Sequence, residues 1–169
     1  MPKEKIVVLM GSDKDFAFAS RIGVFLQEAG FPVECEYEVA SAHKTPKRLL
    51  DILQSQEKTG DNIVFITVAG LSDALSGIVA GNTRYPVIAC PPDSEKYGWA
   101  KVFSSTMTPK GVAVAYVPEP ENAALMALKI LALSNPKLQE KIVFFRRKME
   151  EKVYEAAENL KTKAEKGSK

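Results

Sequence analysis

The segment Ser41-Ala42-His43-Lys44-Thr45-Pro46 brings together side chains that could move a proton and hold an anion. It contains His43, the one histidine among 169 residues, and imidazole is the side chain that most readily exchanges a proton near neutral pH. Lys44 adds a positive charge, while Ser41 and Thr45 add hydroxyl groups. The proline that closes the segment is well suited to begin a helix, whose first N–H groups favour an anion. The segment therefore predicts a proton-transfer site beside a bound anion.

Two further loops carry small and polar residues after a predicted strand. Residues 11–15 place a glycine, Ser12 and Asp15 before a helix, which suits a phosphate or a ribose hydroxyl, although an ordinary helix cap explains them equally well. Residues 69–77 are rich in Gly, Ala and Ser, and Ser72 is placed to cap the next helix. Small residues there admit a ligand or allow tight helix-to-sheet packing, and the sequence alone favours packing.

Other chemistries fit less well. A serine nucleophile with His43 as its base has three candidates, Ser12, Ser41 and Ser72, but the chain has no G-x-S-x-G motif and no evident orienting acid. One histidine without clustered cysteines or carboxylates gives no metal site. A dinucleotide is not indicated, since the G-x-G-x-x-G pattern is absent.

Short apolar runs that alternate with helical patterns must position these loops. The runs are predicted as buried strands over residues 5–10, 32–39, 62–68, 85–90 and 111–117. Five strands that alternate with helices predict a three-layer α/β/α fold. Its most economical form is a flavodoxin-like parallel sheet in the order 2-1-3-4-5. Because the carboxyl ends of parallel strands share one edge, we expect the three loops to meet there.

Two regions lie outside this repeat. Residues 93–110 are expected to form a long loop, a lid or a subunit contact, which contains Tyr97, Trp99, Phe103 and Met107. From Pro136 an apolar stripe predicts one amphipathic helix of about 30 residues, or roughly 45 Å, longer than a domain of this size is wide. We therefore expect a single domain over 1–169, with an α/β core over 5–135 and a helix over 136–165 that packs on a neighbouring subunit of a homo-oligomer.

The composition limits the class of protein. Hydrophobic residues make up 46% of the chain, enough for a full core, and the net charge is only +2, with a pI near 8.4. Basic residues are interspersed with acidic ones, so neither a nucleic acid nor a membrane is expected as a partner. Cys35 and Cys90 lie in strand-like runs without metal-ligand spacing, and no signal peptide or membrane span is evident. We expect a reduced, cytoplasmic protein.

Several motifs together resemble the aminoimidazole ribonucleotide carboxylase/mutase family of purine biosynthesis. They lie at residues 10–15, 41–46, 69–77 and 85–92 and at Ser104-Ser105, and the likeness is collinear over about residues 5–135. One branch of the family moves a carboxyl group from the exocyclic nitrogen to a ring carbon, and the other adds carbon dioxide to that carbon. The resemblance implies a small-molecule substrate, no cofactor, ATP, biotin or metal, and a homo-octamer.

The branch is indicated by Lys44, where the mutase typically has arginine, and by residues 71–77, where the mutase has a second histidine. The resemblance therefore implies a phosphoribosylaminoimidazole carboxylase. Such an enzyme adds CO2 to aminoimidazole ribonucleotide (AIR) to give carboxyaminoimidazole ribonucleotide (CAIR). The alternatives are a mutase that acts on the N-carboxy isomer and a nucleotide-binding paralogue that has lost turnover.

The resemblance also implies roles for individual residues. His43 is the proton carrier. The ribose phosphate is held by Gly11, Ser12, Asp15, Ser41 and Lys44. The carbon dioxide pocket is lined by Gly70, Ser72, Asp73 and Ala74.

Three positions depart from the carboxylase pattern: Lys14 replaces a usual serine, Leu71 a usual arginine and Asp73 a usual asparagine. The carboxylate matters most, because it repels the carboxylate that forms on the substrate. We expect it to be protonated, turned away, or paired with His43 or a lysine.

Overall fold

The computed structural model describes the backbone of residues 2–167, and side chains as far as residue 163. It divides the chain into two compact units, Met1–Leu131 and Ala132–Lys169. Within the described residues the first unit holds a five-stranded parallel sheet in the order β2-β1-β3-β4-β5. The predicted flavodoxin-like fold is confirmed. The strands are β1 Glu4–Met10, β2 Glu34–Val39, β3 Asn62–Val68, β4 Val87–Ala89 and β5 Ala115–Tyr116.

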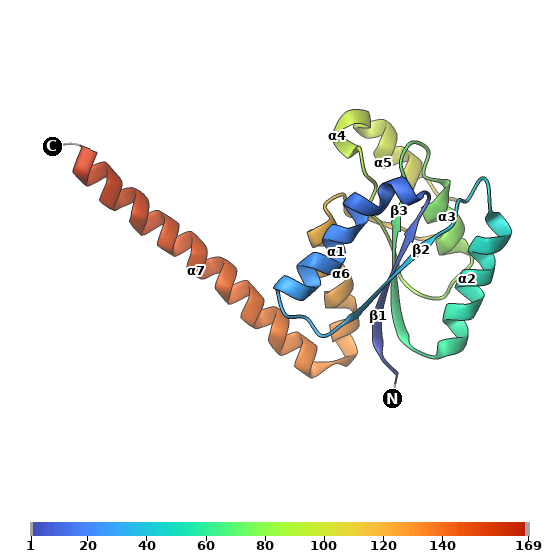
Figure 1. Cartoon of the computed structure of the whole chain (residues 1–169), viewed down its shortest axis with the longest axis horizontal. Helices are drawn as coiled ribbons and strands as arrows, with labels where there is room; N and C mark the ends of the chain where they lie inside the picture. The colour runs from blue at the N-terminus through green and yellow to red at the C-terminus, as the bar shows by residue number, and fades with distance from the viewer. Residues whose placement is uncertain (1, 168–169) are drawn as a thin grey trace. The chain divides into compact units, whose positions relative to one another are not determined.

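Helices cover both faces of this sheet. On one side lie α1 and α6, and on the other α2 and α3, with the strands between them (Figure 1). The helices of the first unit are α1 Phe16–Glu28, α2 Pro46–Thr59, α3 Ala74–Gly81, α4 Ser94–Tyr97, α5 Trp99–Thr106 and α6 Pro120–Leu131, with a 3-10 turn, η1, at Asp13–Asp15.

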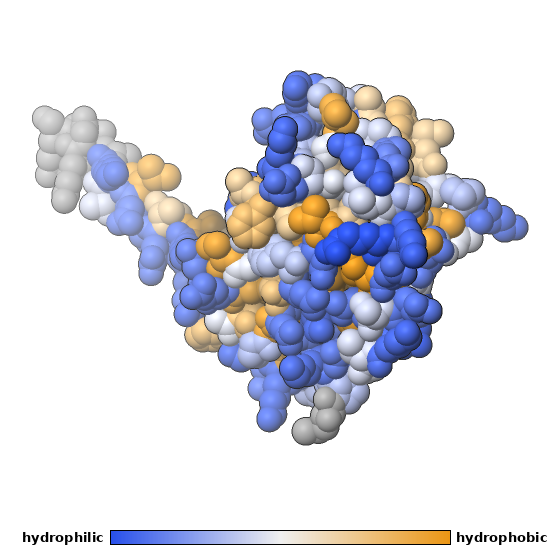
Figure 2. Space-filling view, turned by 45° about the vertical axis from the view of Figure 1, so that its right-hand side comes forward, coloured by the Kyte–Doolittle hydropathy of each residue, from blue (hydrophilic) through white to orange (hydrophobic). Residues whose placement is uncertain are grey.

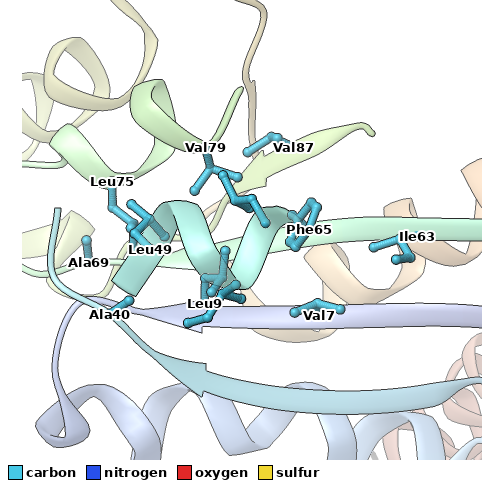
Figure 3. Packing of buried hydrophobic residues seen from close by; sticks show 12 residues of the cluster. Val7, Leu9, Ala40, Leu49, Ile63, Phe65, Ala69, Leu75, Val79 and Val87 are labelled. Atoms are coloured by element: carbon cyan, nitrogen blue, oxygen red, sulfur yellow. The ribbon is translucent and has the colours of Figure 1, made fainter. Parts of the chain in front are cut away.

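The two central strands form the most deeply buried part of the core. Residues 6–10 of β1 and 63–68 of β3 are buried without a break, as expected for parallel strands covered on both faces. Figure 3 shows Leu49 of α2 beside Leu75 of α3, and the same buried cluster also contains Val79 of α3 and Phe65 of β3. Blue, hydrophilic residues predominate on the face seen in Figure 2, interrupted by smaller orange patches. None of the helices in residues 2–167 is both long and apolar enough to cross a bilayer.

The predicted bounds of three strands, β2, β4 and β5, were wrong. β2 begins at Glu34 rather than residue 32, and β4 and β5 keep only three and two residues of the predicted runs. Apolar runs report burial, whereas a strand also needs ladder hydrogen bonds with a neighbour.

Residues 93–110 are not an irregular loop, because they contain α4 and α5, separated by Gly98 at φ 50°. The left-handed glycine breaks the region into pieces too short for a helical period to be recognised.

The second unit contains the turn η2 (Ala132–Ser134) and the helix α7 (Pro136–Gly167). Asn135 begins the helix, since its Oδ1 accepts a hydrogen bond of 3.1 Å from the backbone N–H of Leu138. Large apolar side chains remain exposed along α7, namely Val143, Phe144, Met149, Val153, Tyr154 and Leu160. Packing of this helix on a neighbouring subunit stays a prediction, as does the division of the chain into domains.

Candidate active site

The three loops identified from the sequence meet at one edge of the sheet. Met10, the last residue of β1, is in register with Val39 of β2 and Val68 of β3. Past the strand ends, the backbone N–H of Gly11 bonds the Val68 carbonyl and that of Ala40 bonds the Met10 carbonyl, both at 2.9 Å. The loops therefore leave the sheet side by side, at the edge where open α/β sheets bind ligands.

A pocket of about 420 Å³ lies between these loops. Its lining includes eight of the ten residues that the sequence selected: Gly11, Ser12, Asp15, Ser41, His43, Lys44, Gly70 and Ser72. Lys14 and Leu71, two of the departures from the family pattern, also line it. The remaining two selected residues, Asp73 and Ala74, are not among the lining residues.

The loop with the histidine is braced by its own residues. The Thr45 hydroxyl accepts a hydrogen bond of 2.9 Å from the Ser41 N–H, and the Ser41 hydroxyl accepts one of 3.2 Å from the Lys44 N–H. Thr45 occupies the predicted N-cap position of α2, but its side chain makes no capping bond to that helix. The side chains of His43 and Lys44 are exposed. The loop is thus braced locally, while its imidazole and ammonium groups are exposed at the pocket.

The first loop combines a capping role with a perturbed carboxylate. Ser12 caps the 3-10 turn by accepting a hydrogen bond of 3.2 Å from Lys14 N–H. Asp15 is partly buried, and its carboxylate lies close to the backbone of Gly11 and Gly70. Burial raises the pKa of Asp15, while Lys101 acts in the opposite direction.

Asp73 rather than Ser72 caps α3, so the predicted cap was wrong by one residue. The Asp73 Oδ1 accepts a hydrogen bond of 3.1 Å from the Ser76 N–H, whereas Ser72 is exposed beside the pocket. The Asp73 Oδ2 accepts hydrogen bonds of 2.6 Å from the Ser76 hydroxyl and 2.7 Å from the Ser105 hydroxyl. The Asp73 carboxylate is therefore turned away from the pocket, into the protein interior, where it also acts electrostatically on Lys101.

Helix α5 contributes residues that the sequence reasoning did not select as ligands. Lys101, Ser104 and Ser105 lie three and four positions apart and so share one face of the helix. The Ser104 hydroxyl accepts a bond of 2.6 Å from the Asp73 N–H, and the Lys101 ammonium donates to backbone carbonyls of residues 69 and 71. A prediction of residues 99–106 as a helix would have placed these three polar residues on one face.

In the described part of the chain, no cluster of three or more His, Cys, Asp or Glu side chains could hold a metal ion.

The family model, the relatives and the solved structures that resemble this chain all point to one family. Residues 5–152 match the model of a family described as AIR carboxylase. The chain is 45% identical over 157 residues to the phosphoribosylaminoimidazole carboxylase of Archaeoglobus fulgidus, covering 93% of this chain and 85% of that protein. It is 40% identical over 158 residues to the N5-carboxyaminoimidazole ribonucleotide mutase of Methanocaldococcus jannaschii, covering 92% and 97% respectively. The crystal structure of Treponema denticola PurE matches with a TM-score of 0.88 and 34% identity, covering 94% of this chain and 99% of that one.

Proposed function

The chain belongs to the AIR carboxylase family, and on that premise we propose that it is the phosphoribosylaminoimidazole carboxylase of purine biosynthesis, converting AIR and CO2 to CAIR without ATP. The observation that carries the proposal is that one pocket, at the carboxyl ends of β2, β1 and β3, joins His43 to hydroxyl groups, a lysine and a loop of small residues. Proton transfer beside a bound phosphate needs this combination.

We assign the ribose phosphate to the two loops after β1 and β2. Lys44 provides a point charge for the phosphate, and no side chain caps the first turn of α2, so its N–H groups remain suitable for an anion. Gly11 lets the ligand approach the backbone, while Ser12, Asp15 and Ser41 provide hydrogen-bonding groups for the ribose and the phosphate.

We assign the carboxylation chemistry to His43. The amino-imidazole ring is enamine-like, so its carbon attacks CO2 and becomes tetrahedral, bearing both the new carboxylate and a proton. His43 accepts that proton, which restores the aromatic ring, and returns it in the reverse reaction. Gly70 and Ser72 form the carbon dioxide end of the pocket, and Ala74, which does not line it, follows at the start of α3. Asp73 supports this end of the pocket by capping α3, because its carboxylate points into the interior.

The direct test incubates the purified protein with AIR and bicarbonate in the absence of ATP and measures CAIR formation. Formation of CAIR at an enzymatic rate supports the proposal. A protein that binds AIR without forming CAIR from either carboxyl donor is a binding paralogue, which contradicts the proposal.

The second candidate is the mutase reaction, favoured by the 40% identity to a protein named N5-carboxyaminoimidazole ribonucleotide mutase. Supplying the N-carboxy isomer instead of AIR and bicarbonate separates the two reactions. We favour direct carboxylation because Lys44 and residues 71–77 resemble the carboxylase branch and the chain has no second histidine.

We further propose that the protein is a cytoplasmic homo-oligomer, an octamer by family resemblance. The exposed apolar side chains of α7 support an interface on that helix, and both cysteines are free, as suits a reducing compartment. Sedimentation tests the assembly, and a monomer at micromolar concentration contradicts it.

A further inference from the structure

Lys101 is a buried cation directly beneath the candidate site. Its side chain is only 1% exposed, although lysine is among the residues least often buried without a partner. The Nζ donates hydrogen bonds of 2.5 Å to the Ala69 carbonyl and 2.7 Å to the Leu71 carbonyl. These carbonyls belong to the loop that carries Gly70 and Ser72, so one ammonium group fixes both ends of that turn.

The turn needs such support. Leu71 has a φ of 49°, in the left-handed region that costs a non-glycine residue roughly 1 kcal/mol, and its side chain is exposed. Leu71 lines the candidate pocket and also a second cavity of about 330 Å³, which Lys101 itself lines. Bonds from a buried ammonium to the carbonyls on either side of Gly70 keep the backbone in this conformation.

The same ammonium also balances negative charge. Three carboxylates act on it electrostatically, Asp73 most strongly, then Asp93 and Asp15. Burial lowers the pKa of Lys101, and these carboxylates counteract part of that effect. Carboxylation creates a further anion on the substrate, which an uncompensated acidic cluster would repel.

We propose that Lys101 is a positioning residue for carboxylation, which holds the Ala69–Ser72 turn in place and offsets the charge of the neighbouring carboxylates. The proposal rests on the proposed function, because it assigns this turn to the carbon dioxide end of the pocket. Lys101 bonds main-chain carbonyls and carries no proton of the reaction. It compensates for Asp73, which stands where the family pattern usually has a neutral asparagine.

The test compares Lys101→Met with Lys110→Met, which removes an exposed lysine of the same length from a nearby turn. For Lys101→Met we expect the KM for bicarbonate to rise by about tenfold or more, while the KM for AIR changes much less. Lys110→Met should behave as wild type. A simple loss of fold would instead lower the active fraction without separating the two KM values. Equal kinetics in both variants would overturn the proposal.

The double variant Lys101→Met/Asp73→Asn isolates the charge. It removes the cation together with its strongest carboxylate partner, so we expect it to recover part of the bicarbonate-dependent rate that the single variant loses. Absence of any recovery would overturn the role in charge balance. If Lys101→Met does not fold, the double variant is compared with Asp73→Asn alone, because those two proteins differ only at Lys101. Equal kinetics in that pair would likewise overturn the proposal.

Amide hydrogen exchange separates this inference from the proposed function. In Lys101→Met, the amides of residues 70–74 should exchange about tenfold faster or more, with no such change in Lys110→Met. Wild-type protein that forms no CAIR would contradict the proposed function, and the exchange rates would then decide on Lys101. Unchanged exchange rates in Lys101→Met would overturn the proposal that Lys101 holds the Ala69–Ser72 turn in place.

Discussion

The candidate site has an open half and a buried half that are built differently. In the open half, the loop 41–45, the side chains that could do chemistry are exposed and the bracing bonds join residues three or four apart. In the buried half, Asp73, Ser76, Lys101 and Ser105 are almost wholly enclosed, and the bonds to α5 join residues 30 or more apart.

The difference separates chemistry from architecture. Exposed groups on a locally braced loop can be exchanged at little cost to folding, because few tertiary contacts depend on them. A buried hydrogen-bond network is costly to open, because a buried polar group that loses its partner still carries the cost of desolvation. Substitutions in the open half should therefore change rates, whereas those in the buried half should change stability as well.

His43→Asn should produce the largest effect and confine it to the rate. Loss of the proton carrier should lower kcat by about 10² to 10⁴, while AIR binding and the midpoint of thermal unfolding stay near wild type. Steady-state kinetics, calorimetric titration with AIR and circular dichroism measure these quantities. Lys58→Gln, at an exposed position in the last turn of α2, is the control. A near-normal rate would remove His43 from the mechanism.

Asp73→Ala should instead cost stability. The variant removes the α3 cap and two hydroxyl partners and leaves the Lys101 ammonium without its main counter-charge. We expect a loss of about 2–4 kcal/mol in the free energy of unfolding, measured by urea denaturation. Asp51→Ala, on the exposed face of α2, should stay within about 0.5 kcal/mol of wild type. Equal stability of the two variants would remove the contrast between the halves.

Lys44→Gln returns to the open half with a smaller effect. If the ammonium binds the phosphate, the KM for AIR should rise about tenfold with little change in kcat, since the charge acts on ground state and transition state alike. Added salt should weaken AIR binding to wild type more than to the variant. An identical salt dependence in both proteins would argue against a phosphate at Lys44.

The sequence was sufficient for the parts of the site that depend on local order. The apolar runs before residues 11 and 69 are complete strands, and the parallel order of the sheet then places their loops beside His43 without further information. The capping residue was missed by one position, because both Ser72 and Asp73 are good caps and only the backbone decides between them.

Lys101 could not have been found in this way. Its contacts lie about 30 residues upstream, and the helix that carries it begins after a left-handed glycine that interrupts the pattern. Nothing in a local window distinguishes a buried lysine from the exposed lysines that are the rule. The same limit applies to Asp73. The sequence shows a carboxylate beside the site of carboxylation, but its partners Lys101 and Ser105 lie on α5, about 30 residues further along the chain.

Asp15→Asn should produce the smallest effect and connect the two halves, because Asp15 lines the open pocket yet interacts electrostatically with Lys101. Burial raises the pKa of Asp15 above the usual 3.8, so its charged form is less favourable in the folded state than in the unfolded state. That cost is present at neutral pH and disappears as the pH falls below the unfolded pKa. The midpoint of thermal unfolding of Asp15→Asn should therefore lie slightly above that of wild type at pH 7, by about 2 °C or less. This difference should shrink as the pH approaches 4. Binding of AIR should weaken at the same time, if the carboxylate bonds the ribose. A variant that is less stable at pH 7 would show that the Asp15 carboxylate supports the fold, as Asp73 does, and would place it in the buried half.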